Sequence, residues 1–111
     1  MGKVKDSIIE IAKIYLQEVE KSGIRIGKAY LYGSYSRGEN RKESDIDIAI
    51  ISSDFTGDRF QDALRLKKLR WNIDLRIEPM PIKSEDFTED NPLVNEIIKN
   101  GITLIWEGAT P

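Results

Sequence analysis

Apolar residues recur along this chain at spacings that distinguish helices from strands. Over residues 4–20 they recur every three or four positions with Lys, Glu and Gln between them, which is the pattern of an amphipathic helix. Denser apolar runs over 24–32 and 45–51 predict two strands. The remaining predicted elements are a helix over 58–69, a strand over 71–77, a helix opened by Asn91-Pro92, and a closing strand over 102–106.

This alternation of helices and strands predicts an α/β (α+β) fold in which helices pack on a small mixed sheet of about four strands. The length of 111 residues suits one core, so we expect residues 1–111 to form a single domain. The strand over 71–77 has one polar face and is expected to end at Pro79-Met80-Pro81. The inner face of the helix over 58–69 is predicted to consist of Phe60, Ala63, Leu64, Leu66 and Leu69.

The chain contains no cysteine and no histidine. This excludes disulfides, thiol nucleophiles, imidazole bases and zinc sites of the Cys/His type. A metal ion here would be held by oxygen ligands, which Mg²⁺, Mn²⁺ and Ca²⁺ prefer.

Charge and hydropathy narrow the class of partner. The 17 basic and 19 acidic residues give a net charge of −2, which offers no general attraction to nucleic acid, so nucleic acid is not the expected partner of this chain alone. No apolar run approaches the ~18 residues of a membrane span. We therefore expect no membrane contact and a cytoplasmic location.

Two carboxylates, Asp45 and Asp47, open the second apolar run. Residues i and i+2 of a strand share a face, so these two lie side by side while Ile46 and Ile48 turn the other way. At ~4 Å and an effective dielectric near 20, their charges repel by roughly 4 kcal/mol, and a divalent cation is the simplest way to offset this repulsion. Asp74 adds a third carboxylate if its strand is a neighbour.

Glu78 shares the parity of Asp74 and competes with it for the role of third ligand. At ~3.3 Å per residue, Glu78 would lie about 13 Å farther along the strand, and Pro79 follows it. We therefore expect Asp45, Asp47 and Asp74 to hold two Mg²⁺ ions that position a triphosphate. Asp74 would also orient the attacking hydroxyl or accept its proton.

A turn of small residues, Gly33-Ser34, lies just before the polar connector that leads to the aspartates. Glycine lets the backbone approach a phosphate closely, and the amides at a helix N-terminus bind anions. A short helix beginning at Ser34 or Tyr35 would present such amides. Ser34 could add a hydroxyl contact and Arg37 a cation beside the phosphates.

Taken together, Gly33-Ser34, the connector ending in Glu43-Ser44, and Asp45-Ile46-Asp47 resemble the signature of the DNA polymerase beta-like nucleotidyltransferase superfamily. Ile73-Asp74-Leu75-Arg76 is similar to the third-carboxylate strand of that superfamily. The resemblance spans about 30–78, and the short length is similar to the minimal nucleotidyltransferases of bacteria and archaea.

The resemblance implies a nucleoside triphosphate donor, usually ATP, two Mg²⁺ ions (with Mn²⁺ as a substitute), and transfer of a nucleoside monophosphate with release of pyrophosphate. It also implies that Asp45, Asp47 and Asp74 are the metal ligands and that Gly33 and Ser34 form the phosphate loop. Basic positions in the connector vary within such families, so the resemblance supports Arg37 less directly.

The resemblance further implies a partner. Minimal nucleotidyltransferases are often paired with a small helical protein of the HEPN type, as the antitoxin that adenylylates a hydroxyl, typically of tyrosine, on that partner. Two alternatives stay open: a non-catalytic module that neutralises its partner by binding, and a nucleotidyltransferase that acts on a small molecule or on RNA. The oligomeric state is also open, a homo-oligomer included.

Overall fold

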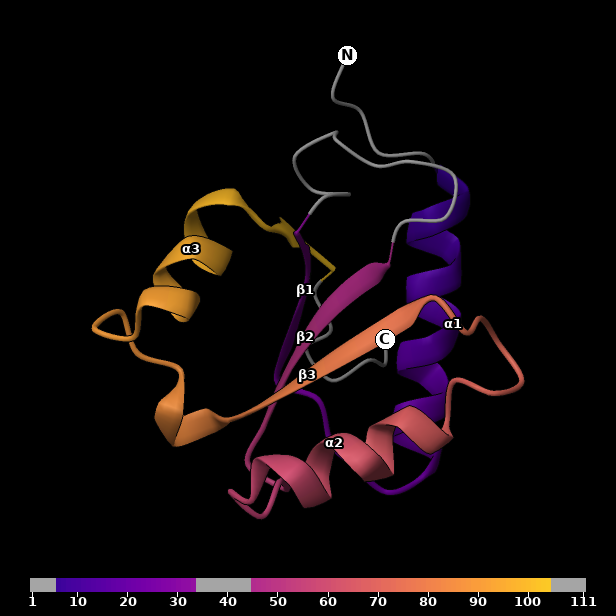
Figure 1. The fold of residues 1–111 in the computed structure, drawn as a ribbon, viewed down its shortest axis with the longest axis horizontal. Coiled ribbons are helices and arrows are strands. Elements are labelled where there is room, and N and C mark those ends of the chain that lie inside the picture. The colour runs from indigo at the N-terminus through magenta and orange to yellow at the C-terminus, as the bar shows by residue number, and fades with distance from the viewer. Residues whose placement is uncertain (1–5, 34–44, 105–111) are drawn as a thin grey trace.

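The computed structural model describes residues 6–33 and 45–104 of the chain. The short helix expected to begin at Ser34 or Tyr35 lies outside these residues. The elements, labelled as in Figure 1, are α1 (Asp6–Lys21), β1 (Lys28–Tyr32), β2 (Ile46–Ser52), α2 (Arg59–Lys68), β3 (Ile77–Lys83), a 3₁₀ turn η1 (Ser84–Asp86), α3 (Pro92–Asn100) and β4 (Ile102–Thr103).

The four strands form one mixed sheet in the order β3-β2-β1-β4. Strands β2 and β3 run parallel, whereas β1 pairs antiparallel with both β2 and β4. Because β2 and β3 are parallel, both begin at the same end of the sheet, and the backbone N–H of Ile46 donates to the carbonyl oxygen of Arg76 there (2.8 Å). The predicted α/β fold with a small mixed sheet is confirmed.

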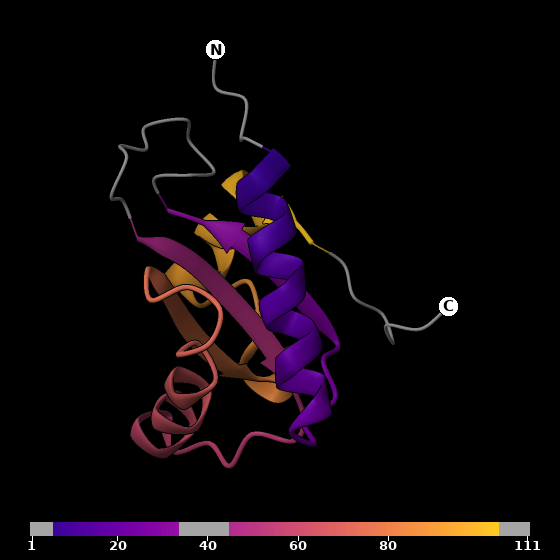
Figure 2. The ribbon, with the colours of Figure 1, turned by 90° about the vertical axis from the view of Figure 1, so that its right-hand side faces the viewer.

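Helices cover both faces of the sheet, with α1 and α3 on opposite sides (Figures 1 and 2). On the face covered by α1 and α2, alternate strand residues such as Leu31, Ile48 and Ile77 are fully buried in the main core. On the α3 face, Ala49, Ile51, Ile82 and Ile97 form a smaller cluster. The alternation of β2 that the sequence predicts therefore supplies both clusters, one from each face.

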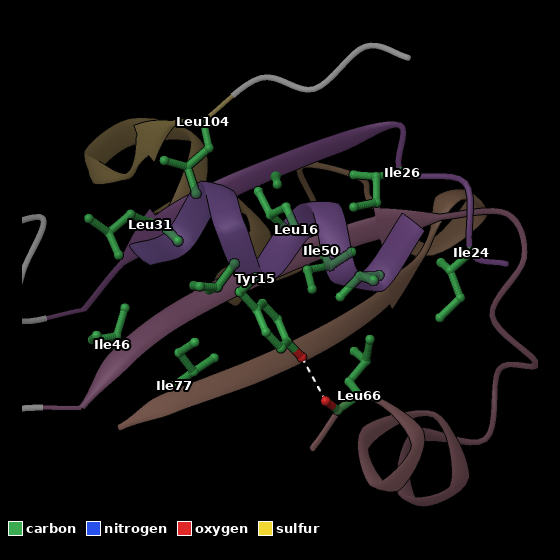
Figure 3. Close-up of a cluster of buried hydrophobic side chains, with 14 of the residues drawn as sticks. Tyr15, Leu16, Ile24, Ile26, Leu31, Ile46, Ile50, Leu66, Ile77 and Leu104 are labelled. Atoms are coloured by element: carbon green, nitrogen blue, oxygen red, sulfur yellow. Dashed lines mark hydrogen bonds between the residues drawn. The ribbon is translucent and has the colours of Figure 1, made fainter. Parts of the chain in front are cut away.

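The hydroxyl of Tyr15 connects α1 to α2 within the main core. It donates a 2.7 Å hydrogen bond to the carbonyl oxygen of Leu66 (Figure 3). The side chains of both residues are fully buried. Burial keeps the phenol neutral by raising the pKa of Tyr15 well above its usual value.

Tyr15→Phe is expected to lower the free energy of unfolding by about 1 kcal/mol, because it removes one buried hydrogen bond while the carbonyl of Leu66 still accepts from Leu69 N–H. Urea denaturation measures the change. Tyr30→Phe is the matched control, since the Tyr30 ring stacks on Phe87 and its hydroxyl makes no hydrogen bond in the described part of the chain. An equal loss in both variants would contradict a specific role for the Tyr15 hydroxyl.

The predicted strand over 71–77 is wrong, and the third strand lies further along the chain at β3. Residues 69–73 instead continue α2 as turns, and β3 passes through Pro79 and Pro81, which were expected to end a strand. Backbone groups of successive strand residues point to opposite sides. The backbone carbonyl of Arg76 faces β2, so the backbone groups of residues 77, 79 and 81 face the outer edge of the sheet. Among the described residues no strand pairs with that edge, so the missing N–H of proline costs no hydrogen bond there.

The predicted inner face of α2 is also partly wrong. Phe60 and Leu64 are 72% and 44% exposed, whereas Asp62 and Leu66 are buried. The Asp62 carboxylate accepts from Thr56 N–H and Oγ1 (both 3.0 Å) and from Gly57 N–H (3.1 Å), so its burial is compensated. The inner side of α2 therefore carries Asp62, held by the preceding loop, together with the apolar Leu66.

Candidate active site

Pairing across three strands brings Tyr32, Asp47 and Glu78 into one row. Asp47 is the register partner of Tyr32 on β1 and of Glu78 on β3. Paired residues on neighbouring strands point to the same face, which here is the face covered by α3. Burial, and after it the nearby charges of Asp47 and Glu78, raise the pKa of Tyr32 to about 12. We call Asp47 and Glu78 the carboxylate pair.

Asp45 extends this pair toward the end of the sheet. It directly precedes the first residue of β2 and is exposed. Strand alternation places it on the same face as Asp47, two residues further on. The two predicted aspartates and Glu78 therefore belong to one region, where β2 and β3 begin.

Gly33 lies directly against this region, at the end of β1. Its φ is +76°, a left-handed conformation that favours glycine. A Cβ added there would overlap Asp47 Oδ2 and lie 3.1 Å from Asp47 Cγ. Gly33 and Asp47 are thus close neighbours, as their predicted common role requires. Ser34 and Arg37, the other predicted phosphate-binding residues, lie outside the described residues.

Asp74 lies in the turn before β3, not on the strand. Its carboxylate accepts from Arg76 N–H (2.9 Å), Nε (3.0 Å) and Nη2 (2.8 Å). The side-chain hydrogen bond from Arg76 holds the pKa of Asp74 below its usual value. Above the pKa of the unfolded carboxyl, the ionised Asp74 therefore stabilises the fold, and this contribution is lost as the pH falls through the folded pKa. Because Arg76 donates to both carboxylate oxygens of Asp74, each oxygen already accepts a hydrogen bond.

Glu78 is bonded differently. Its Oε2 accepts from Arg70 Nη1 at 3.2 Å, and the same nitrogen donates to the Ile77 carbonyl oxygen at 2.7 Å. The Glu78 side chain is 41% exposed, so it can reach a ligand from solvent. From the sequence alone, Asp74 and Glu78 are expected on one strand, with Glu78 too far along it to be a ligand. The parallel register of β2 and β3 instead puts Glu78 beside Asp47.

The donor set suits a hard divalent cation completed by a substrate. Within residues 6–33 and 45–104, no three carboxylates gather closely enough to hold an ion by themselves. Mg²⁺ is commonly held by only one or two carboxylates, with substrate phosphates and water as its other ligands. The oxygen-only side chains beside Gly33 fit such a site, and a triphosphate at the turn would supply the remaining ligands.

Comparisons with known proteins agree on one family. A family model described as polymerase beta nucleotidyltransferase matches residues 10–107. A Haemophilus influenzae protein named probable protein adenylyltransferase MntA is 33% identical over 90 residues, which cover 78% of this chain and 74% of that protein.

Solved structures share the fold. A candidate nucleotidyltransferase from Sulfolobus solfataricus has a TM-score of 0.64 at 21% identity, with 93% of this chain and 89% of that chain covered. A toxin–antitoxin structure with AMP-PNP has a TM-score of 0.62 at 24% identity, with 89% and 74% covered. Among the described residues, no helix is long and apolar enough to cross a membrane.

Proposed function

Because the chain belongs to the polymerase beta nucleotidyltransferase family, we propose that it transfers AMP from ATP to a hydroxyl group of a protein partner, as the antitoxin of a toxin–antitoxin pair with a HEPN-type protein. The H. influenzae relative is named as a probable protein adenylyltransferase, and the toxin–antitoxin structure was solved with AMP-PNP. These two names support the choice of donor and acceptor.

The observation that carries the proposal is the contact between Gly33 and Asp47. A backbone turn that binds a phosphate and a carboxylate that holds the metal ion on that phosphate must lie next to each other. At Gly33 the left-handed φ and the missing side chain allow this adjacency. The turn would hold the triphosphate, while Asp47 and its neighbours would face the metal ions bound to it.

Asp45, Asp47 and Glu78 would hold Mg²⁺, which would neutralise charge on the triphosphate and on the leaving pyrophosphate. Glu78 is our choice for the third ligand because it pairs with Asp47 in the sheet register, whereas Arg76 occupies both oxygens of Asp74. The role of Asp74 as third ligand stays a prediction, and the variants below distinguish the two residues.

In the proposed reaction the acceptor hydroxyl oxygen attacks the α-phosphorus of ATP. A new O–P bond forms, the bond from the α-phosphorus to the bridging oxygen breaks, and pyrophosphate leaves with the electron pair. A carboxylate at the start of β2 and β3 accepts the hydroxyl proton. The surface of the acceptor protein would help to orient its hydroxyl toward the α-phosphorus.

Glu78→Gln is expected to weaken binding of Mn²⁺ in the presence of a non-hydrolysable ATP analogue by at least about tenfold, because it removes a charged ligand. Asp74→Asn should leave that affinity within about twofold, since Arg76 already engages its carboxylate. Calorimetric titration with Mn²⁺ gives both values without relying on turnover.

The pH dependence of the stability of Asp74→Asn tests whether Asp74 has a structural role. The substitution should lower the free energy of unfolding at neutral pH. This loss should vanish in acid, where the wild-type carboxyl is protonated and is therefore uncharged like the asparagine. If Asp74→Asn weakened Mn²⁺ binding and Glu78→Gln did not, Asp74 would be the third ligand.

The proposed function is tested by incubating the purified chain with Mg²⁺, labelled ATP and a HEPN-type protein from the same genome. ATP labelled at the α-phosphate should label the HEPN-type protein, and ATP labelled at the γ-phosphate should not, because the γ-phosphate leaves with pyrophosphate. Label from the γ-position would indicate phosphoryl transfer instead. No label from either position would refute the proposal.

A further inference from the structure

Large apolar side chains are exposed along α2 and the turn that follows it. Six such residues are exposed in the described part of the chain, and four of them belong to this stretch; the six are Ile14, Phe60, Leu64, Trp71, Leu75 and Ile98. Phe60 and Trp71 are 72% and 69% exposed. We call Phe60, Leu64, Trp71 and Leu75 the α2 stripe. A concentration of exposed aromatic and aliphatic side chains is typical of an interaction site.

Unpaired positive charge accompanies the α2 stripe. The four basic residues of α2 are all exposed, and none forms an ion pair within the part of the chain that the structure describes; they are Arg59, Arg65, Lys67 and Lys68. The only acid of α2, Asp62, is buried against the preceding loop. In a chain whose net charge is −2, this helix is therefore a local cationic surface that suits an acidic partner.

The α2 stripe leads toward the candidate active site. Ten residues at 1.5 Å rise make α2 about 15 Å long, and its C-terminal end continues into the turn that starts β3 (Figure 1). In that turn Arg70 bonds Glu78 at 3.2 Å, and Leu75 lies between Asp74 and Arg76 in sequence. A partner seated along α2 would have one end beside Arg70 and Glu78, at the edge strand of the sheet.

We propose that the α2 stripe is the docking surface for the protein that accepts the nucleotide, and that it binds a helix with apolar and acidic residues on one face. This inference rests on the function proposed above. An RNA would match the cations but would leave Phe60 and Leu64 without an apolar partner. A second copy of the chain, joined through the same face, would bring four more cations against the four already present.

Paired variants test the docking surface with the HEPN-type protein of the labelling assay as the probe. Phe60→Ser with Trp71→Ser should raise its Kd at least about tenfold, because exposed aromatic residues dominate such contacts. Lys67→Glu with Lys68→Glu should also raise the Kd and reduce its salt dependence. Ile14→Ser with Ile98→Ser is the matched control, with side chains 50% and 41% exposed outside the stripe, and should leave the Kd unchanged.

Kinetics separate docking from chemistry. The stripe variants should raise KM for the HEPN-type protein while kcat at saturation and the affinity for ATP stay at wild-type values. If these variants bind and label the protein as wild type does, the docking surface is refuted and the proposed function stands. If wild type binds the protein through the stripe without labelling it, the proposed function fails and the docking surface stands.

The remaining outcomes decide against the docking surface. If the wild-type chain neither binds nor labels the HEPN-type protein, both proposals are refuted. RNA binding that depends on Lys67 and Lys68, without any binding of the HEPN-type protein, would assign the surface to nucleic acid. Self-association that Phe60→Ser with Trp71→Ser abolishes, again without binding of that protein, would assign it to a second copy of the chain.

Discussion

Asp47→Asn is expected to abolish nucleotide transfer, with a loss of at least about 10³-fold in kcat/KM. The substitution keeps the size of the side chain, which packs against Gly33, and removes the charge that would face the metal and the triphosphate in the proposed function. Transfer of the α-phosphate label under saturating Mg²⁺ measures the loss.

The fold should survive Asp47→Asn, because the change also removes a negative charge beside Glu78. The pKa of Tyr32, raised to about 12 by burial and then by the charges of Asp47 and Glu78, should fall, and ultraviolet titration of the phenol reports this. A variant that kept its activity while the Tyr32 pKa fell would show that Asp47 is not catalytic.

Gly33→Ala is expected to cost both stability and activity. The left-handed backbone at φ +76° costs an alanine about 1–2 kcal/mol. Its Cβ would also overlap Asp47 Oδ2, so the carboxylate must move, and a misplacement of about 1 Å lowers activity by about 10²-fold. Denaturation and the labelling assay measure the two effects separately.

Gly57→Ala is the matched control for Gly33→Ala. Gly57 also has a left-handed φ, +97°, but the nearest atom to an added Cβ is Lys83 Cδ at 3.8 Å. This variant should lose about the same 1–2 kcal/mol from backbone strain and keep full activity. If both variants kept full activity, close approach at Gly33 would not be needed for catalysis.

Much of the architecture follows from local sequence. The helical spacing over 4–20 predicts α1, and the apolar run over 45–51 predicts β2 to within one residue at each end. Asn91 caps α3 by accepting from Leu93 N–H at 2.9 Å, with Pro92 at the first position, as the Asn-Pro pair predicts. The resemblance carried by Gly33-Ser34 and Asp45-Ile46-Asp47 is confirmed by the family match over residues 10–107.

Two predictions, the strand over 71–77 and the inner face of α2, each rest on one local pattern and are wrong in whole or in part. Alternation alone predicts a strand over 71–77 that ends at Pro79-Met80-Pro81. Proline is excluded from a strand only where its missing N–H would face a neighbour, and the sheet order decides that. Apolarity correctly predicts that Leu66 faces inward, but it does not predict that loop donors bury Asp62 while Phe60 and Leu64 stay exposed.

The sequence by itself therefore determined the elements with strong local patterns, the oxygen-only chemistry and the motif of Gly33, Asp45 and Asp47. Only the tertiary structure decided that Glu78 lies beside Asp47, that Asp74 is bound by Arg76, and that Phe60 faces outward. The physical reason is that local sequence patterns do not encode every contact that a residue makes. Periodicity and capping depend on residues a few positions apart. Strand register depends on a partner strand far away in the chain. The contacts of Asp62 and Asp74 span only two to six positions, but they depend on how the loop and the turn fold, which periodicity does not encode.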